Sequence, residues 1–115
     1  MKPKTQFHYR VTEFLTVLGS PESSFSEEYN YSGNLKENRK TALAFALDRQ
    51  KGIEKRGHYR DIKLAKPPAI EGAAYSVSVE LVETYDGWEF TYNVYGEDLE
   101  TTKETLSIEQ RIGAI

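Results

Sequence analysis

The sequence predicts an α+β protein: a single antiparallel sheet of about four to five strands, with one main helix packed across one face as a two-layer sandwich. Three observations lead to this prediction. A long hairpin pattern of alternating apolar and polar residues fills 75–95, a stretch with helical spacing fills 35–56, and another alternating run fills 6–18. The expected order is β-β-α-β-β, followed by a C-terminal strand or short helix.

The pair Asp86 and Gly87 defines the long hairpin, because it is typical of two-residue type I′ loops. Such a loop sets the register, and the expected cross-strand pairs are Tyr85–Trp88, Glu83–Phe90, Leu81–Tyr92 and Val79–Val94. One face then collects Tyr75, Val77, Val79, Leu81, Tyr85, Trp88, Phe90, Tyr92 and Val94. The other face is mostly polar and also carries Val82 and Tyr95.

Two further strands are expected at the N-terminal end. The first places Phe7, Tyr9, Val11, Leu15 and Val17 on one face. After the turn-forming stretch GSPESS, the second strand places Phe25, Tyr29 and Tyr31 on one side. The pattern predicts a hairpin and leaves its register open.

The main helix is expected to begin after Asn34, a favourable N-cap, and to end at about Arg56, just before Gly57. Its apolar arc comprises Leu35, Ala42, Leu43, Phe45, Ala46, Leu47 and Ile53. Gly52 weakens the helix interior and marks a kink or an early end.

Residues 57–74 are predicted to be a connector with a short edge strand through Ile62 and Leu64. Its tandem prolines rule out a central strand or a helix there. The C-terminal tail is ambiguous. Leu106, Ile108 and Ile112 fit a strand, whereas Leu99, Leu106 and Gly113 align on a helix.

The composition is that of one polar globular domain spanning residues 1–115, with 38% hydrophobic and 29% charged residues. The chain has no cysteine, so disulfides and thiolate chemistry are excluded. No signal-peptide pattern and no long apolar run is present, and we expect a cytoplasmic protein without membrane contact. The sequence contains no recognisable metal-binding motif, and no cofactor is predicted.

Charge is distributed unevenly along the chain. Residues 36–66 hold ten basic and four acidic side chains, whereas residues 67–115 hold two basic and ten acidic ones. The segment 49–66 is therefore a candidate nucleic-acid contact, using Arg56, Arg60, Lys63 and Lys66. Against this, the lysines of the helix alternate with acids, as on an ordinary solvated face.

Arg49 lies at the edge of the apolar arc, between Phe45 and Ile53, and glutamates interrupt the apolar faces of the strands at 13, 27 and 83. A carboxylate from the sheet is expected to reach Arg49, because an arginine–carboxylate pair tolerates partial burial. The functional interpretation is a polar pocket lined by Tyr9, Tyr29, Tyr85 and Tyr92. The candidate ligand-binding set is Arg49, Glu13, Glu83, Tyr9, Tyr85 and Tyr92. The alternatives are side chains that extend to water at the sheet margin, a β-bulge that turns Glu13 outward, and a purely structural ion pair.

These patterns favour a small non-enzymatic binding domain whose partner is a protein or a second copy of the chain. The acidic, tyrosine-bearing outer face of the long hairpin, with Glu80, Glu89, Val82 and Tyr95, suits a basic partner. A nucleic-acid accessory protein is the first alternative. A binder of a small polar ligand, or an enzyme, centred on Arg49 and the inward glutamates is the second.

Overall fold

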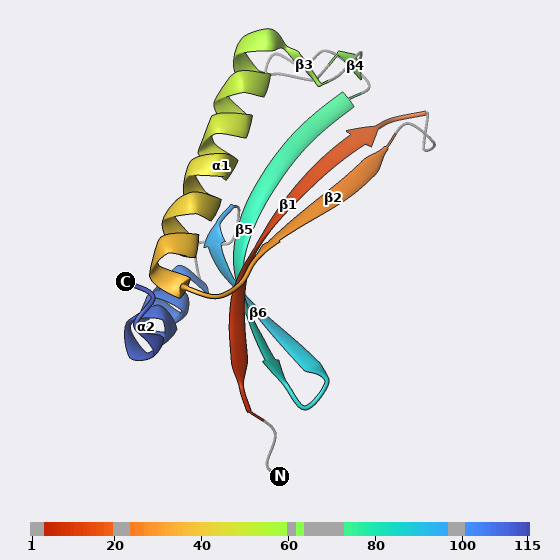
Figure 1. Ribbon diagram of the computed structural model, residues 1–115. Coiled ribbons are helices and arrows are strands. Elements are labelled where there is room, and N and C mark those ends of the chain that lie inside the picture. Colours follow the sequence, from red (N-terminus) through yellow and green to blue (C-terminus); the bar gives the residue numbers. More distant parts are fainter. Residues whose placement is uncertain (1–3, 20–23, 60–61, 64–72, 97–100) are drawn as a thin grey trace.

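The computed structural model describes residues 4–19, 24–59, 62–63, 73–96 and 101–115, and confirms the predicted fold class. A four-stranded antiparallel sheet has the order β2-β1-β5-β6. Its strands are β1 (Gln6–Val17), β2 (Phe25–Tyr31), β5 (Ala73–Tyr85) and β6 (Trp88–Tyr95). Helices α1 (Leu35–Arg56) and α2 (Thr101–Ile112) lie on the same side of the sheet (Figure 1).

The boundaries of α1 follow from its caps, as predicted. The side chain of Asn34 accepts a hydrogen bond from the backbone N–H of Glu37 at 3.0 Å, and Gly57 adopts the left-handed conformation with φ 74°. Gly52 neither kinks nor ends the helix, which continues to Arg56. The helix therefore keeps the predicted length.

The buried stripe of α1 is narrower than the predicted arc. Ala42, Ala46 and Ile53 are buried, whereas Leu47 is 41% exposed. Arg49 belongs to this stripe, because positions 42, 46, 49 and 53 are three or four residues apart and therefore lie on one face of the helix. Arg49 therefore faces the sheet directly instead of lying at the margin of the apolar arc.

The structure settles the register of both hairpins. In the first, Tyr9 pairs with Tyr31, Glu13 with Glu27 and Leu15 with Phe25. In the second, the predicted pairs hold from the turn to Leu81–Tyr92. The predicted pair Val79–Val94 is wrong: the register shifts between Val79 and Glu80, so Val79 pairs with Tyr95 and Val94 is the extra residue of a β-bulge.

Two other expectations are corrected. Among the described residues, the predicted edge strand at Ile62 does not join the main sheet: β3 (His58–Tyr59) and β4 (Ile62–Lys63) pair with each other as a separate two-stranded sheet. Leu64 and the proline-containing residues 64–72 lie outside the described part. The tail is the helix α2, and its buried positions are Thr105, Ile108 and Glu109, whereas Leu106 is 39% exposed.

The core lies between the sheet and both helices. Its main cluster comprises Tyr9, Val11, Ala42, Ala46, Val77, Val79, Leu81, Ile108 and Ala114. A smaller cluster, made of Leu15, Ile53, Tyr59 and Ala73, lies where β3 meets the C-terminal half of α1. The molecule is elongated, with extents of 51 × 25 × 25 Å.

The N-cap gives a test of this helix boundary. Replacing Asn34 with alanine should lower the free energy of unfolding by about 1 kcal/mol, because the N–H of Glu37 loses its acceptor. Urea titration measures the change. Ser32→Ala, at an exposed position just before the helix, is the control and should change it by less than about 0.5 kcal/mol. Equal effects of the two substitutions would contradict this role of Asn34.

Candidate functional site

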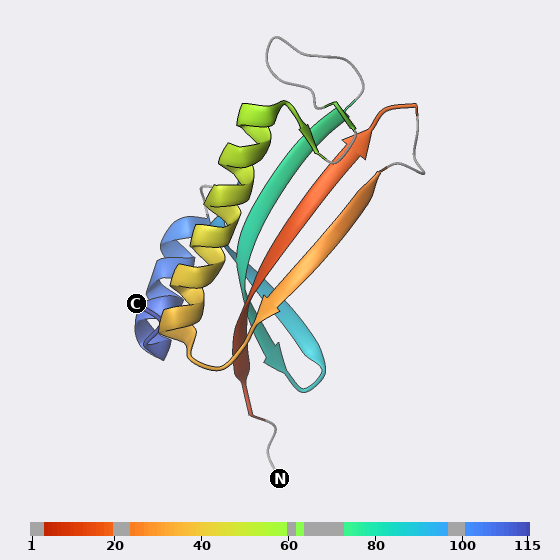
Figure 2. The same ribbon diagram turned by 45° about the horizontal axis from the view of Figure 1, so that its top comes forward.

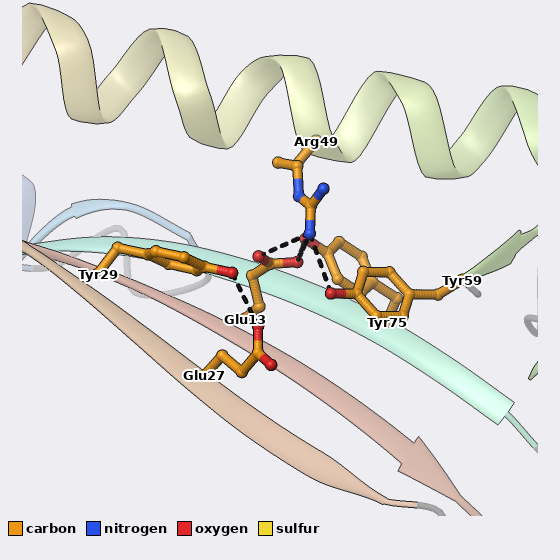
Figure 3. Close-up of polar contacts among 6 residues, drawn as sticks. All are labelled: Glu13, Glu27, Tyr29, Arg49, Tyr59 and Tyr75. Atoms are coloured by element: carbon orange, nitrogen blue, oxygen red, sulfur yellow. Dashed lines mark hydrogen bonds and ion pairs between the residues drawn. The ribbon is translucent and has the colours of Figure 1, made fainter.

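The candidate site forms around Glu13, whose side chain is fully buried in the middle of β1. Arg49 reaches it from α1: its Nη2 donates to Oε1 at 3.1 Å and to Oε2 at 3.2 Å of Glu13. Tyr75 on β5 donates its hydroxyl proton to Oε2 of Glu13 at 2.8 Å (Figure 3). The predicted contact between Arg49 and a sheet carboxylate is therefore present. One nitrogen of Arg49, Nη2, makes both hydrogen bonds to Glu13.

Arg49 is held on several sides at once. Nη2 also donates to the hydroxyl of Tyr59 at 2.9 Å, and the guanidinium carbon lies 5.6 Å from the ring centre of Phe45 and 5.4 Å from that of Tyr59. Its Nε is buried and has no hydrogen-bond partner within the described part of the chain. About a third of the side chain, 32%, stays exposed. The guanidinium is therefore fixed in place but keeps donor capacity.

The strand register explains why a cation is needed here. Glu13 and Glu27 are direct cross-strand neighbours of β1 and β2, and two like charges in that position repel each other. Arg49 compensates Glu13. Tyr29, whose ring packs 5.0 Å from Phe45, donates its hydroxyl proton to Glu27 at 2.8 Å. The site thus holds two carboxylates on one face of the sheet. Arg49 donates hydrogen bonds to Glu13, and Tyr29 donates one to Glu27.

Burial and hydrogen bonding shift the ionisation of these groups. The pKa of Tyr75 is raised by burial and by its hydrogen bond to Glu13, and the pKa of Tyr29 is raised first by its hydrogen bond to Glu27 and then by burial. Burial opposes the charge of Arg49, but the hydrogen bond and negative charge of Glu13 outweigh it, so the pKa of Arg49 is raised. Both phenols therefore keep their protons and act as hydrogen-bond donors, and Arg49 stays positively charged.

A cavity of about 280 Å³ opens beside this cluster. Its walls are Glu27, Tyr29, Arg49, Arg56 and Tyr59. Arg56 belongs to the exposed last turn of α1, where its Nε donates to the carbonyl of Gly52 at 3.2 Å. Of the four tyrosines predicted to line a pocket with Arg49, Tyr29 is the one that lines this cavity.

The other predicted pocket residues lie elsewhere. Glu83 accepts a hydrogen bond from Tyr92 at 2.8 Å. On β5 it is six residues from Val77, the partner of Glu13, which corresponds to roughly 20 Å of strand. Tyr85 is half-exposed at the end of the hairpin. One polar pocket containing all three with Arg49 was therefore a wrong prediction, because the long hairpin extends beyond α1.

Tyr9 belongs to a second buried cluster, which sequence reasoning missed. Its hydroxyl and Nε of Arg39 both donate to Oε2 of Glu109, each at 2.5 Å, and Glu109 is fully buried in α2. Burial, followed by the hydrogen bond to Glu109, raises the pKa of Tyr9. The sequence holds a signal for the position of Glu109. One helix face of the tail would contain Thr105, Ile108, Glu109 and Ile112, and this places Glu109 among the inward-facing positions.

The nucleic-acid candidates do not form a described patch. Arg60 and Lys66 lie outside the described residues, and Lys63 is described only as part of the backbone of β4. Arg56 faces the cavity instead. The nucleic-acid interpretation therefore stays a prediction that these residues neither support nor contradict.

A separate surface lies at the opposite end of the molecule. The loop that joins β5 to β6 projects past α2 in both views (Figures 1 and 2). Around it, Tyr85 is 45% exposed, Phe90 50% and Trp88 70%. Since Tyr85 pairs with Trp88, and Phe90 with Glu83, these side chains share the face that the helices cover further along the sheet. We call Tyr85, Trp88 and Phe90 the aromatic tip.

Within the ranges that the structure describes, no three histidine or acidic side chains come together as metal ligands. In the same ranges, neither helix combines the length and the hydrophobicity required to cross a bilayer.

Comparison of the chain with models of known protein families found no match, and searches of curated proteins and of solved structures found no significant match either.

Arg49 can be tested as the compensating charge of Glu13. Arg49→Met keeps an apolar stem against Phe45 and Tyr59 but leaves a buried carboxylate without its cation, and should lower the free energy of unfolding by about 2–3 kcal/mol. Arg56→Met, on the exposed last turn of the same helix, should cost less than about 0.5 kcal/mol. Urea unfolding compares them, and equal losses would show that Glu13 does not depend on Arg49.

The buried phenols predict a loss of stability in alkali. Above the ordinary tyrosine pKa of 10.0, the unfolded chain releases protons that the folded chain keeps on Tyr9 and Tyr75. Below pH 10.0 the two tyrosines stabilise the folded chain fully. Above it, the free energy of unfolding should fall by about 1.4 kcal/mol per pH unit for each of the two tyrosines. Urea titrations from about pH 8 to about pH 11 measure this slope. The double variant Tyr9→Phe/Tyr75→Phe should flatten it, and an unchanged slope would contradict the assignment.

Proposed function

We propose that this chain is a cytoplasmic, non-enzymatic domain that binds another protein through the aromatic tip. The observation that carries the proposal is the exposure of three large aromatic side chains on one face of a projecting hairpin, with Trp88 at 70%. Aromatic residues, tryptophan and tyrosine above all, contribute most of the energy of protein interfaces when a partner buries them. Here the fold leaves them uncovered.

The position of the aromatic tip supports this proposal. The core cluster lies further along the sheet, so the fold does not need Trp88 for its own packing. The hairpin itself is fixed, because Asp86 and Gly87 both adopt the positive φ angles of a tight turn, 47° and 81°. A rigid hairpin presents its side chains to a partner at little cost in conformational entropy.

Charge indicates the kind of partner. Asp86 and Glu89 flank the aromatic tip and are exposed, with Glu89 paired to Arg10 at 2.8 Å, and residues 67–115 carry ten acidic against two basic side chains. A partner with an apolar pocket rimmed by lysine or arginine fits this surface. The outer-face set predicted from sequence fits less well, since Val82 is fully buried and Tyr95 packs against the core.

Binding should depend on Trp88. Trp88→Ala should weaken partner capture at least ~30-fold, the effect of losing a central aromatic anchor of 2 kcal/mol or more. Leu18→Ala is the matched control, because Leu18 is also strongly exposed, at 76%, but lies at the far end of β1. The measurement is affinity capture from native extract, followed by titration of the identified partner at rising salt, which should weaken binding.

Folding and self-association are checked in parallel. Both variants should keep the free energy of unfolding within about 0.5 kcal/mol of the parent chain. Sedimentation of the purified chain shows whether the partner is a second copy, in which case Trp88→Ala should yield the monomer. Equal partner capture, or equal self-association, by the Trp88→Ala and Leu18→Ala variants would refute the proposal.

A further inference from the structure

The outer edge of β6 lies open beside the aromatic tip. Strand β6 is at one end of the sheet order, with β5 as its neighbour. Residues 88–91, its first four, are all exposed, whereas Tyr92, Val94 and Tyr95 pack against the core cluster. This part of the hairpin projects away from both helices (Figure 1). The edge at 88–91 is therefore accessible to a partner.

The hairpin register shows which backbone groups point outward. In a hairpin with a two-residue loop, the residues that flank the loop form a hydrogen-bonded pair, and such pairs alternate along the strands. Tyr85 and Trp88 flank the loop, so Trp88 and Phe90 direct their backbone groups toward β5. Glu89 and Thr91 direct theirs away from it. Among the described residues, no hydrogen bond satisfies the backbone N–H and C=O of Glu89 and Thr91 on that side.

The exposed part of β6 lacks the features that usually protect an edge strand. Proline, lysine, bulges and inward-pointing charges are the common devices against further pairing. The other edge strand, β2, has such a charge, since Glu27 lies on the face that α1 covers. Residues 88–91 contain neither proline nor lysine, and the bulge of β6 lies beyond them at Val94. This edge is therefore able to accept another strand.

The two faces that an added strand would extend differ in chemistry. One face carries the aromatic tip. On the other, Nη2 of Arg10 lies 2.8 Å from Oε1 of Glu89, and its Nε lies 3.7 Å from Oε2 of Glu28. Glu80 is the cross-strand neighbour of Arg10 and shares that face, as does the formally neutral His8. One arginine therefore stands among three described carboxylates, and this face is acidic.

This charge pattern favours a basic segment over a second copy of the chain. Residues 73–96 contain four acidic side chains and no lysine or arginine. Pairing β6 with β6 of a second copy would therefore bring like charges together, whereas lysine or arginine would complement them. In known cases of strand addition, main-chain hydrogen bonds supply affinity and alternate side chains supply specificity.

We infer that the partner of the aromatic tip supplies an extended segment of alternating apolar and basic residues, which pairs with β6 at Glu89 and Thr91 as a fifth strand of the sheet. Its apolar side chains lie beside Trp88 and Phe90, and its lysine or arginine side chains lie on the acidic face. This inference rests on the proposed function, because it takes the aromatic tip as the binding site and adds the conformation and charge of the partner.

The probe is an acetylated and amidated peptide of about nine residues in which valine and lysine alternate. Trp88 is the only tryptophan of the chain, so its fluorescence reports binding at this edge without a label. Titration of the full chain should shift the emission to the blue, with a dissociation constant below about 1 mM. A peptide of the same composition, with its valines in one block and its lysines in another, should bind at least about tenfold more weakly.

Backbone pairing is tested on the peptide, without changing the protein. N-methylation of all lysines removes the N–H groups along one edge of the peptide strand, and N-methylation of all valines removes those along the other edge. A fifth strand bonds to β6 through one edge, so one methylated peptide should bind at least about tenfold more weakly than the other. Equal binding of the two methylated peptides would contradict strand pairing.

A substitution on β6 tests the same pairing from the side of the protein. Thr91→Pro removes an N–H that points away from β5, so the pairing of β6 with β5 should persist. It should weaken peptide binding at least about tenfold. Thr91→Val keeps the N–H and is the matched control, which should bind like the parent chain. Urea unfolding checks the fold of both variants, and the methylated peptides decide the question on the parent chain alone.

The results separate this inference from the proposed function. If calorimetry shows that Trp88→Ala loses the peptide while Thr91→Pro keeps it, the aromatic tip binds without strand pairing and the inference is wrong. If sedimentation shows a parent dimer that Thr91→Pro converts to monomers, a second copy occupies the edge and the basic segment is wrong. A dissociation constant above about 1 mM for the alternating peptide also overturns the inference, and partner capture by Trp88→Ala still tests the proposed function.

Discussion

The burial of two carboxylates is the constraint on which the rest of this structure depends. Glu13 in the sheet and Glu109 in α2 are both fully buried, and neither is tolerable as an isolated charge. Each is met by an arginine of α1, Arg49 for Glu13 and Arg39 for Glu109, and each also accepts a tyrosine hydroxyl proton. The two arginines are ten residues apart, about 15 Å along the helix. Helix α1 is therefore attached to its surroundings at two separate points.

The residues between those points explain how the helix can lie so close to the sheet. Arg39, Ala42, Ala46, Arg49 and Ile53 form one stripe, and its two alanines are fully buried. Their small side chains let the helix approach β1 and β5, so arginines at both ends of the alanines reach the buried carboxylates directly. The ion pairs add less net stability than apolar contacts of the same size would, because desolvation offsets most of the attraction. What they fix is position: sliding α1 by one turn would leave both carboxylates without cations.

The sequence predicts the local features well because each depends on few neighbouring residues. Asp86 with Gly87 sets one hairpin, and Asn34 with Gly57 bounds the helix. The contact between Arg49 and Glu13 was predictable from two periodic patterns that each placed a charge among apolar positions. The Arg39–Glu109 pair was missed, because the tail was left open as a strand or a helix and only the helical spacing places Glu109 among apolar positions. The bulge at Val94 was not predicted from the hairpin pattern. Glu83 and Tyr85 were wrongly placed beside Arg49 because the local pattern does not show that the hairpin extends beyond α1.

The elongated shape separates the cavity beside Arg49 from the aromatic tip. The cavity lies where β3 meets the end of α1, and the aromatic tip lies at the far end of β5. From Val77, opposite Glu13, to Tyr85 is eight residues of strand, or roughly 26 Å. Substitutions that far apart, with no shared contacts, have additive effects. Between the two lie the central residues Val77, Val79 and Leu81 of β5, which are packed in the core and resist displacement. Changes at the cavity and at the aromatic tip are therefore expected to be independent of each other.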